Sequence, residues 1–313
     1  MNGHRCTLVI HPGALGDVLQ AVPALRALRL DGPLAFSGQA RLGGLLRGLG
    51  VVDAVLPFDG LGLDALFTRE PAPSSLVARL ARFDRVISWF GARDTLYPGQ
   101  LRVIARDAVI APPVPDGESR VTVWRHLLAT TGATSGPTLT PLEVPEPWRD
   151  EARRRLAVLG AVPARPLIVI HPGAGGQWKR WPVEYLARTI AAIVREHEAQ
   201  ALIHDGPADH AAVDQLGRIL TVPTLRLVEP DLPLLTGILS HASAYLGADS
   251  GVSHLAAAVG APAVILFPAA TRAGWTPWSP TAAALTMTGA ADQVDTVAAA
   301  VSERLRAPER RAG

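Results

Sequence analysis

Cysteine and lysine are almost absent from this sequence. Its 313 residues include a single cysteine, Cys6, which excludes a disulfide framework, and the apolar run around Cys6 predicts a place in the core. All but one of the 30 basic residues are arginine, and the exception is Lys179. A single lysine can be an ordinary surface residue, but in so arginine-rich a chain its position calls for an explanation.

Long apolar runs are missing as well. No run reaches the ~18 residues that a membrane-spanning helix needs. The nearest, LAAAVGAPAVILF, is shorter and contains Gly260 and Pro262. The segment CTLVIHPGALGD reaches an acidic residue before the apolar region of a signal peptide could be completed, so we expect no signal peptide. The expected location is the cytoplasm, with at most peripheral contact at the inner face of the cytoplasmic membrane.

Charge of either sign is scarce. Charged residues make up 19% of the chain and the formal net charge is +2, although the pI is about 9.1. A nucleic-acid-binding surface needs a dense basic patch, so we expect no nucleic-acid partner. Acidic residues are interleaved with seven arginines between residues 41 and 93, which predicts a solvated surface; the alternative is that these arginines meet an acidic acceptor such as a phosphorylated lipid core. They are Arg41, Arg47, Arg69, Arg79, Arg82, Arg85 and Arg93.

One ten-residue pattern occurs twice, as LVIHPGALGD at residues 8–17 and as IVIHPGAGGQ at residues 168–177. Around each copy, continuous apolar runs of strand length alternate with segments of helical period, which predicts parallel sheets covered on both faces. The chain is too long for one core, so we expect two doubly wound Rossmann-like domains, residues 1–145 and 146–313, joined at the proline-rich segment TLTPLEVPEPWRD. Ligands of such sheets bind at the carboxyl ends of the strands, so both repeated turns should face a central cleft.

The second copy leads into HPGAGGQWKRWP, which places a glycine turn between a strand and a helix. The backbone N–H groups of such a turn, together with the ammonium of Lys179, suit phosphate oxygens. The alternative is a plain strand-to-helix turn. The dinucleotide fingerprint G-x-G-x-x-G fails because Trp178 occupies the place of the third glycine, and no suitable acid follows about twenty residues later, which argues against an oxidoreductase.

A second candidate for anion binding is the segment YLGADSGVSHLAAAVGAPAVILF. A strand is predicted to end at Asp249, Ser250 and Gly251, and a helix to start at about Val252 with His254 in its first turn. Helix capping alone explains an Asp or a Ser at such a place. A cap, a glycine and a histidine together at the carboxyl end of a strand are typical of a helix N-terminus that binds an anion.

Three segments together resemble the hallmark segments of glycosyltransferase family 9, the lipopolysaccharide heptosyltransferases. They are GALGDVLQAVPALRALR, HPGAGGQWKRWP and GADSGVSHLAAAVGAPAVILF, and their order and spacing fit the family from residue 8 to residue 280. The resemblance implies a GT-B fold with an N-terminal acceptor domain and a C-terminal domain for a nucleotide sugar. It also implies an inverting reaction without a metal ion. We expect the C-terminal helix to pack back across the hinge.

The resemblance assigns roles to matching positions. Asp17 matches the family's general base, and Lys179 matches the lysine that contacts the donor phosphate. Asp249 matches the acid that holds sugar hydroxyls, and the loop that grips the diphosphate corresponds to Ser250, Gly251, Val252 and His254. Further residues expected around these sites are Gly175 on the donor side and, in the cleft, Gly13, Gly16 and Asp209. For Asp17, the alternative is an N-cap of the helix that follows.

The proposed chemistry suits these residue types. In an inverting transfer, an acceptor hydroxyl attacks the anomeric carbon from the face opposite the leaving diphosphate, so a carboxylate must accept its proton. A lysine and helix N-terminal amides stabilise the charge on the diphosphate, and no D-x-D triplet occurs in the sequence. His11 and His171 end the repeated strands without Cys or Glu at ligand spacing, so we expect them to bond to the backbone, and we expect no metal and no cofactor.

Three departures from the family pattern bear on specificity. His11 and Pro12 replace an arginine-containing turn, Asp205 adds a charge where a Gly-Gly-Pro turn is usual, and Pro268 changes a segment that is commonly F-G-P-T. These departures concern the nucleotide base and the sugar rather than the fold.

The predicted function is transfer of a heptose or a related sugar from a nucleotide diphosphate donor, with ADP-heptose favoured. The acceptor would be a saccharide or a lipid-linked molecule such as the lipopolysaccharide inner core. Two alternatives stay open: a nucleotide-sugar epimerase of GT-B type, and a non-catalytic nucleotide-sugar-binding protein. An epimerase needs several acid/base groups around the sugar ring, and the sequence offers one clear candidate, Asp17.

Overall fold

The computed structural model describes residues 5–306 except 106, 118, 134 and 135. The chain divides into two compact units, Met1–Leu139 and Thr140–Gly313. The sequence predicted the division at residue 145, within the proline-rich segment, and the first residues after Leu139 belong to the second unit. No helix in these described ranges is long and apolar enough to cross a membrane.

The first unit is built on a five-stranded parallel sheet with the strand order β3-β2-β1-β4-β5. The first copy of the repeated pattern supplies β1, whose four residues are all buried, as a continuous apolar run predicts. Cys6, which was expected in the core, is partly exposed just before β1. The strands are β1 (Thr7–Ile10), β2 (Leu34–Gly38), β3 (Ala54–Pro57), β4 (Arg85–Ser88) and β5 (Ala108–Ile110).

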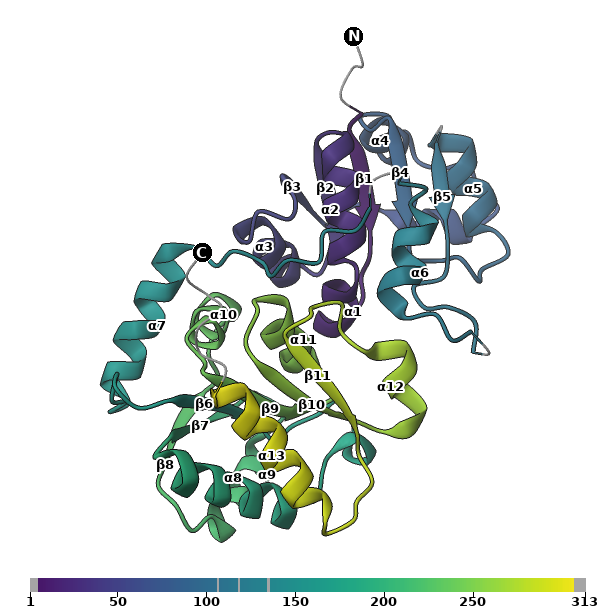
Figure 1. The fold of residues 1–313 in the computed structure, drawn as a ribbon. Helices are drawn as coiled ribbons and strands as arrows, with labels where there is room; N and C mark the ends of the chain where they lie inside the picture. Colours follow the sequence, from purple (N-terminus) through teal and green to yellow (C-terminus); the bar gives the residue numbers. More distant parts are fainter. Residues whose placement is uncertain (1–4, 106, 118, 134–135, 307–313) are drawn as a thin grey trace. The chain divides into compact units, whose positions relative to one another are not determined.

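Helices flank this sheet (Figure 1). α2 packs against α6, and α5 packs against the 3-10 helix η1. Apolar residues of β1, β2 and β4 form a core with Leu63, Leu76 and Leu101 from η1, α4 and α5. The helical segments are α1 (Leu15–Gln20), α2 (Val22–Asp31), α3 (Ala40–Gly48), η1 (Leu63–Phe67), α4 (Ser74–Leu80), α5 (Tyr97–Ile104) and α6 (Val123–Thr130).

The second unit is built on a six-stranded parallel sheet with the strand order β11-β10-β9-β6-β7-β8. Counted from β6, this is the 3-2-1-4-5-6 order of a Rossmann fold. The second copy of the repeated pattern supplies β6, which lies between β9 and β7, with His171 opposite Gly247 of β9. The strands are β6 (Leu167–His171), β7 (Gln200–Asp205), β8 (Thr224–Val228), β9 (Ala244–Ala248), β10 (Ala263–Phe267) and β11 (Ala282–Thr286).

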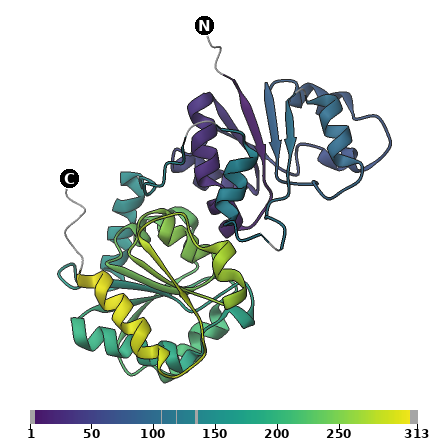
Figure 2. The ribbon, with the colours of Figure 1, turned by 45° about the vertical axis from the view of Figure 1, so that its right-hand side comes forward.

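Two helical layers cover this second sheet (Figure 2). One layer contains α8, α9 and α13, and the other contains α7, α10 and α11. The segment expected to return across the hinge is α13, whose buried residues Val294, Val297 and Val301 belong to the core of its own unit. The helical segments are α7 (Glu146–Val158), η2 (Gln177–Lys179, a 3-10 helix), α8 (Val183–His197), α9 (His210–Ile219), α10 (Leu232–Ser240), α11 (Gly251–Ala258), α12 (Ala269–Trp275) and α13 (Gln293–Arg306).

Strand order reverses once in each sheet, between β1 and β4 in the first unit and between β6 and β9 in the second. Loops that leave the carboxyl ends of such a strand pair diverge to opposite faces of the sheet, which opens a crevice where ligands of doubly wound folds bind. The segments that follow these strands carry Asp17 in α1 after β1, Lys179 at the end of η2 after β6, and Asp249 directly after β9. The topology therefore places all three predicted site residues at switch points.

Candidate functional site

An ion pair joins the two switch-point loops of the second unit. After β6 the chain turns through glycines into η2, which ends at Lys179, and after β9 it reaches Asp249. Lys179 Nζ lies 2.8 Å from Asp249 Oδ2. The Asp249 side chain is only 4% exposed and that of Lys179 is 23% exposed, so the pair is shielded on the carboxylate side and open on the ammonium side.

A histidine completes this group. His254 Nε2 lies 3.7 Å from the other carboxylate oxygen, Asp249 Oδ1. Burial raises the pKa of the Asp249 carboxyl, but the neighbouring His254 and Lys179 more than offset this effect, so the pKa lies below its usual value. Asp249 therefore stays ionised at neutral pH. The imidazole of His254 is itself buried, between the rings of Phe267 and Trp275.

A buried hydrogen-bond network fixes the start of α11. Ser250 is the N-cap, and its Oγ accepts a hydrogen bond from the Ser253 amide at 3.2 Å. Ser253 Oγ donates to the Ala248 carbonyl at 2.5 Å and lies 2.8 Å from the hydroxyl of Tyr245. The capping explanation of Ser250 is therefore correct. The Ser250 cap accepts only the Ser253 amide, and the amides of Gly251 and Val252 have no acceptor inside the helix. This end of α11 can therefore still bind an anion.

The glycine turn after β6 is shaped by a neighbouring acid. A side chain at Gly173 would overlap the carboxylate of Asp209, which follows β7, so this position needs glycine. Gly175 is exposed and has open space around it. The exposed indole of Trp178 lies under the Lys179 ammonium, with Nζ 5.4 Å from the ring centroid.

Two histidines and Asp209 converge beside this turn. The Nδ1 atoms of His171 and His204 lie 3.0 Å apart, and the Asp209 carboxylate lies 4.0 Å from His171 Nδ1. Burial lowers the pKa of His204 to about 4 and that of His171 well below its usual value. The sequence predicted that His171 would bond to the backbone. This was wrong, because its ring faces a second histidine on the adjacent strand.

Asp17 lies in the first turn of α1, and its carboxylate has a structural contact. Asp17 Oδ2 accepts a hydrogen bond from the Ala14 amide at 2.8 Å, as in a capping box. The alternative that Asp17 is itself the N-cap is wrong, because Ala14 is the N-cap and Asp17 is the third residue of the helix. Gly13 is needed beside it, because a side chain there would crowd Asp17 and His11. Gly16 lies in the same turn of α1.

A pocket of about 440 Å³ opens next to Asp17 at the β1/β4 switch point. His11 lies at its base, 1% exposed, and neither ring nitrogen has a hydrogen-bond partner. The Asp17 backbone nevertheless lies close enough to act on the imidazole, so a backbone contact of His11 stays a prediction. The ring packs edge-on to Trp89, with centroids 5.5 Å apart. The pocket is lined by His11, Pro12, Gly13, Asp17, Trp89, Phe90, Gly91, Ala92, Arg93, Asp94, Pro112, Pro113 and Val114.

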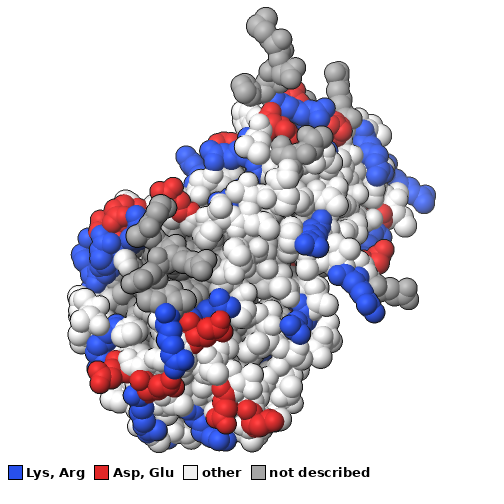
Figure 3. Space-filling model, viewed as in Figure 1, with Lys and Arg blue, Asp and Glu red and all other residues white. Residues whose placement is uncertain are grey.

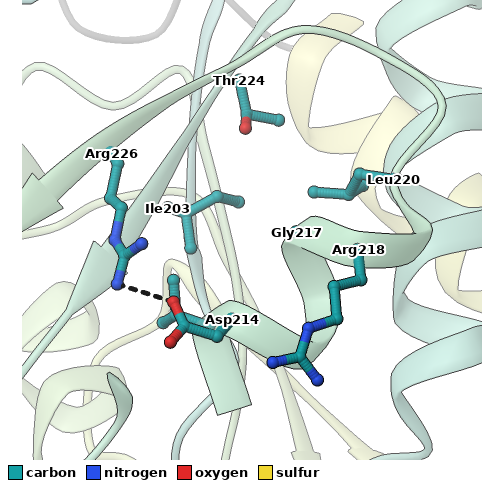
Figure 4. Close-up of a pocket in the computed structure, with 8 residues that line it drawn as sticks. Ile203, Asp214, Gly217, Arg218, Leu220, Thr224 and Arg226 are labelled. Atoms are coloured by element: carbon teal, nitrogen blue, oxygen red, sulfur yellow. Dashed lines mark ion pairs between the residues drawn. The ribbon is translucent and has the colours of Figure 1, made fainter. Parts of the chain in front are cut away.

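Another pocket lies between α9 and strands β7 and β8 (Figure 4). Two of its charged residues pair with each other, Arg226 with Asp214 at 3.0 Å, and Arg226 also pairs with the fully buried Asp205 at 2.6 Å. Asp205, which departs from the usual Gly-Gly-Pro turn of the family, is thus paired with Arg226 in the structure. The lining includes Thr224, at the start of β8. It includes no residue from the carboxyl ends of β6 and β9, where the switch point lies, so this pocket is not the candidate site.

The charged surface agrees with the sequence. On the face shown in Figure 3, acidic and basic side chains are interleaved and form no continuous basic patch. Several arginines of the first unit have partners in that unit: Arg85 bonds to the Thr131 carbonyl and Arg79 to the Gly60 carbonyl.

In the second unit the structure brings together Lys179, Asp249, Ser250 and His254, with Gly251 and Val252 in the first turn of α11. Asp209 lies with the two histidines instead. Sequence reasoning missed His204, because nothing in the local sequence reveals that β6 and β7 pair with their carboxyl ends aligned.

A family model and curated relatives both identify glycosyltransferase family 9, the family that the sequence resembles. A family model described as "Glycosyltransferase family 9 (heptosyltransferase)" matches residues 74–299. Lipopolysaccharide heptosyltransferase 3 of Escherichia coli strain K12 is 31% identical over 157 residues, which is 49% of this chain and 45% of the relative. The chain thus matches less than half the length of this curated relative.

Solved structures share the fold. The glycosyltransferase family 9 protein of Veillonella parvula DSM 2008 has a TM-score of 0.75 at 17% identity, over 94% of this chain and 88% of its own. The ADP-heptose lipopolysaccharide heptosyltransferase II of E. coli has a TM-score of 0.73 at 19% identity, over 96% and 98%. E. coli heptosyltransferase WaaC, solved with ADP, has a TM-score of 0.66 at 16% identity, over 96% and 99%. The predicted GT-B fold class is confirmed.

Proposed function

This chain belongs to glycosyltransferase family 9, and we propose that it transfers a heptose or a related sugar from a nucleotide diphosphate donor to a saccharide or lipid-linked acceptor. The observation that carries the proposal is the ion pair of Lys179 and Asp249 at the capped N-terminus of α11, on the switch point of the second sheet. ADP-heptose is the favoured donor, because a relative of the same fold was solved with ADP.

The second unit would bind the donor diphosphate. The ammonium of Lys179 is its open positive charge, and the free amides of Gly251 and Val252 add the partial positive charge of a helix N-terminus. When the bond between the anomeric carbon and the diphosphate oxygen breaks, negative charge builds on that oxygen. Preorganised donors stabilise such charge without reorganising, so no metal ion is needed for this step.

Asp249 would have two tasks. It holds the Lys179 ammonium at 2.8 Å, and because its carboxyl stays ionised it can accept hydrogen bonds from sugar hydroxyls. His254 Nε2 lies 3.7 Å from the other oxygen of this carboxylate, and both side chains are only 4% exposed.

The first unit would bind the acceptor in the pocket beside Asp17. Apolar and aromatic walls with a few polar groups are typical of pockets for sugars and other small molecules. Asp17 would take the proton from the attacking hydroxyl as this oxygen bonds to the anomeric carbon, and the configuration at that carbon inverts. Asp17 Oδ2 is held by the Ala14 amide, so Oδ1 is the oxygen that would receive the proton.

The test of this assignment is Asp17→Asn. An asparagine oxygen can still accept the Ala14 hydrogen bond, so we expect an unchanged fold, unchanged ADP affinity by calorimetry, and a loss of transfer of about 10²–10⁴-fold in a product assay by mass spectrometry.

The matched control is Asp31→Asn, which changes an exposed acid at the end of α2 and should keep full activity. Normal transfer by Asp17→Asn would contradict the base assignment. Epimerised sugar in a reaction without acceptor would favour the epimerase, and donor binding without product across an acceptor panel would favour a non-catalytic binder.

A further inference from the structure

The group formed by His171, His204 and Asp209 has no part in the proposed transfer, yet it collects three ligand-type side chains in one buried place. His171 ends β6, His204 lies one residue before the end of β7, and Asp209 immediately precedes α9. Their burial is similar, with 4%, 4% and 8% of each residue exposed. One nitrogen or oxygen from each residue lies within 4.8 Å of the others.

The separations suit a bound ion. Two ligand atoms held at about 2.1 Å from one ion lie roughly 3.0 Å apart at an angle of 90° and roughly 3.4 Å apart at the tetrahedral angle. The two Nδ1 atoms are 3.0 Å apart. Asp209 Oδ2 is 4.0 Å from His171 Nδ1, and all three ligand atoms lie within 4.8 Å of one another. The carboxylate would have to move toward both imidazoles, by about 1–1.5 Å, to complete a three-ligand set.

A hydrogen bond between two neutral imidazoles accounts for the histidine contact, but it does not account for the acid. In the part of the chain that the structure describes, no side chain donates a hydrogen bond to the Asp209 carboxylate, although its side chain is only 12% exposed; the Gly206 backbone and the charge of Arg180 are the groups that stabilise it. Gly173 and Gly206 leave room for this carboxylate, because a side chain at either position would run into it. Two glycines thus keep an acid next to two imidazoles whose Nδ1 atoms face each other. In the hydrogen bond one Nδ1 carries the proton; with the proton on Nε2 in both rings, both Nδ1 lone pairs would be available to an ion.

We propose that His171, His204 and Asp209 bind one divalent transition-metal ion, for which zinc is the representative example. Two imidazoles and one carboxylate are ligands typical of zinc and of non-haem iron(II), whereas magnesium and calcium prefer all-oxygen sites. Three protein ligands leave at least one coordination position free. The ion would tie the glycine turn after β6 to the loop after β7, on the same edge of the sheet as Lys179.

Arg180 is the nearby cation that acts on both His171 and Asp209, and a bound ion would have to coexist with its charge. The polar residues on the other side of the loop have partners of their own. His210 uses Nδ1 to contact Asp205 and Nε2 to contact Glu229, both at 2.8 Å, and Arg226 occupies the other oxygen of Asp205. These contacts form a separate group on the β8 side of the loop, which supplies a control for surface binding.

The test is made on the full chain without any nucleotide sugar, so its outcome is independent of the proposed transfer. We incubate the wild-type protein with excess Co²⁺, remove unbound ion by gel filtration, and measure retained cobalt by mass spectrometry and visible absorption. The expected result is one Co²⁺ per chain, displaced by Zn²⁺ and removed by EDTA. Retention of no ion would overturn the proposal, and this measurement requires no variant to fold.

Variants locate the ion. His204→Gln and Asp209→Asn should each weaken Co²⁺ binding by at least about tenfold, while His210→Gln should bind as the wild type does. Loss of the ion in His210→Gln together with its retention in His204→Gln would place it on the exposed neighbour and overturn the assignment. X-ray absorption of the zinc-loaded wild type should show two imidazoles in the first coordination sphere; a sphere of oxygens alone would contradict the site.

Discussion

The ion pair of Lys179 and Asp249 sets the balance of charge at the proposed donor site. Its ammonium is the sole lysine nitrogen of the chain, and it faces both a buried carboxylate and open space. A phosphate that binds here would contact an ammonium that is already paired with Asp249, whereas an unpaired lysine would first have to leave its solvent-exposed positions. This contact requires little side-chain rearrangement, because the ammonium already has its position.

Lys179→Ala should weaken ADP binding by about 10–100-fold, because a hydrogen bond to a charged group contributes roughly 1.5–3 kcal/mol. Calorimetry with ADP measures this change. Lys179→Arg keeps the positive charge and should retain most of the affinity. Equal affinity in the alanine variant and the wild type would show that the phosphates bind elsewhere.

His11 makes the first unit sensitive to acid. Burial lowers the pKa of its imidazole, and the nearby Asp17 carboxylate offsets this only in part. The unfolded chain therefore binds this proton more readily than the folded chain, so stability is complete above an unfolded pKa of about 6.5 and falls as the pH drops below it.

His11→Gln should remove this part of the pH dependence. Urea unfolding at pH 7.5, 6.5 and 5.5 should show a shallower loss of stability in the variant, by up to about 1.4 kcal/mol per pH unit for one proton. His126→Gln, which changes a partly buried histidine of the same unit, is the control and should follow the wild-type slope. Parallel curves for His11→Gln and the wild type would refute the prediction.

At the scale of elements, the contact between α7 and α10 depends on a glycine. A side chain at Gly237 would overlap the backbone carbonyl oxygen of Trp148, which cannot move without distorting α7. Gly217 of α9 has nothing near its missing side chain. The two positions thus offer the same substitution in helices of the same unit with opposite surroundings.

Gly237→Ala should lower the free energy of unfolding by about 1–3 kcal/mol through overpacking, whereas Gly217→Ala should raise it by roughly 0.5–1 kcal/mol through helix propensity. Urea denaturation followed by circular dichroism gives both values. A stabilising Gly237→Ala would mean that α7 does not pack on α10 as described.

Helices and strands were predictable from the sequence where neighbouring residues alone show a regular pattern of apolar positions. Strands such as β6 and β10 are continuous apolar runs, and burial of every residue follows from that composition. α7 was missed, because prolines stand before it and in its first turn and its residues are mostly charged, so the segment looks like a linker. Pro147 is nevertheless compatible with the first turn of a helix, where no backbone donor is needed.

At the scale of the molecule, the repeated ten residues mark the first strand of two separate sheets, and each is followed by a switch-point loop that carries a predicted site residue. The sequence was sufficient for the family, the parallel sheets and the segment from Asp249 to His254, because those motifs are contiguous. The ion pair of Asp249 with Lys179 joins residues from two different segments and was not predicted. It was insufficient for the His171, His204 and Asp209 group, because its members come from two strands and a loop whose alignment depends on sheet register. Residues that meet only through register leave no local pattern.

The hydrogen bond from the Ala14 amide to Asp17 determines when the Asp17 side chain becomes ordered. One carboxylate oxygen is anchored to the backbone before any acceptor arrives, so the side chain has already lost most of its rotational freedom when a hydroxyl approaches. In the proposed reaction the entropy of orienting the base would therefore be settled during folding, once per molecule, rather than at every turnover.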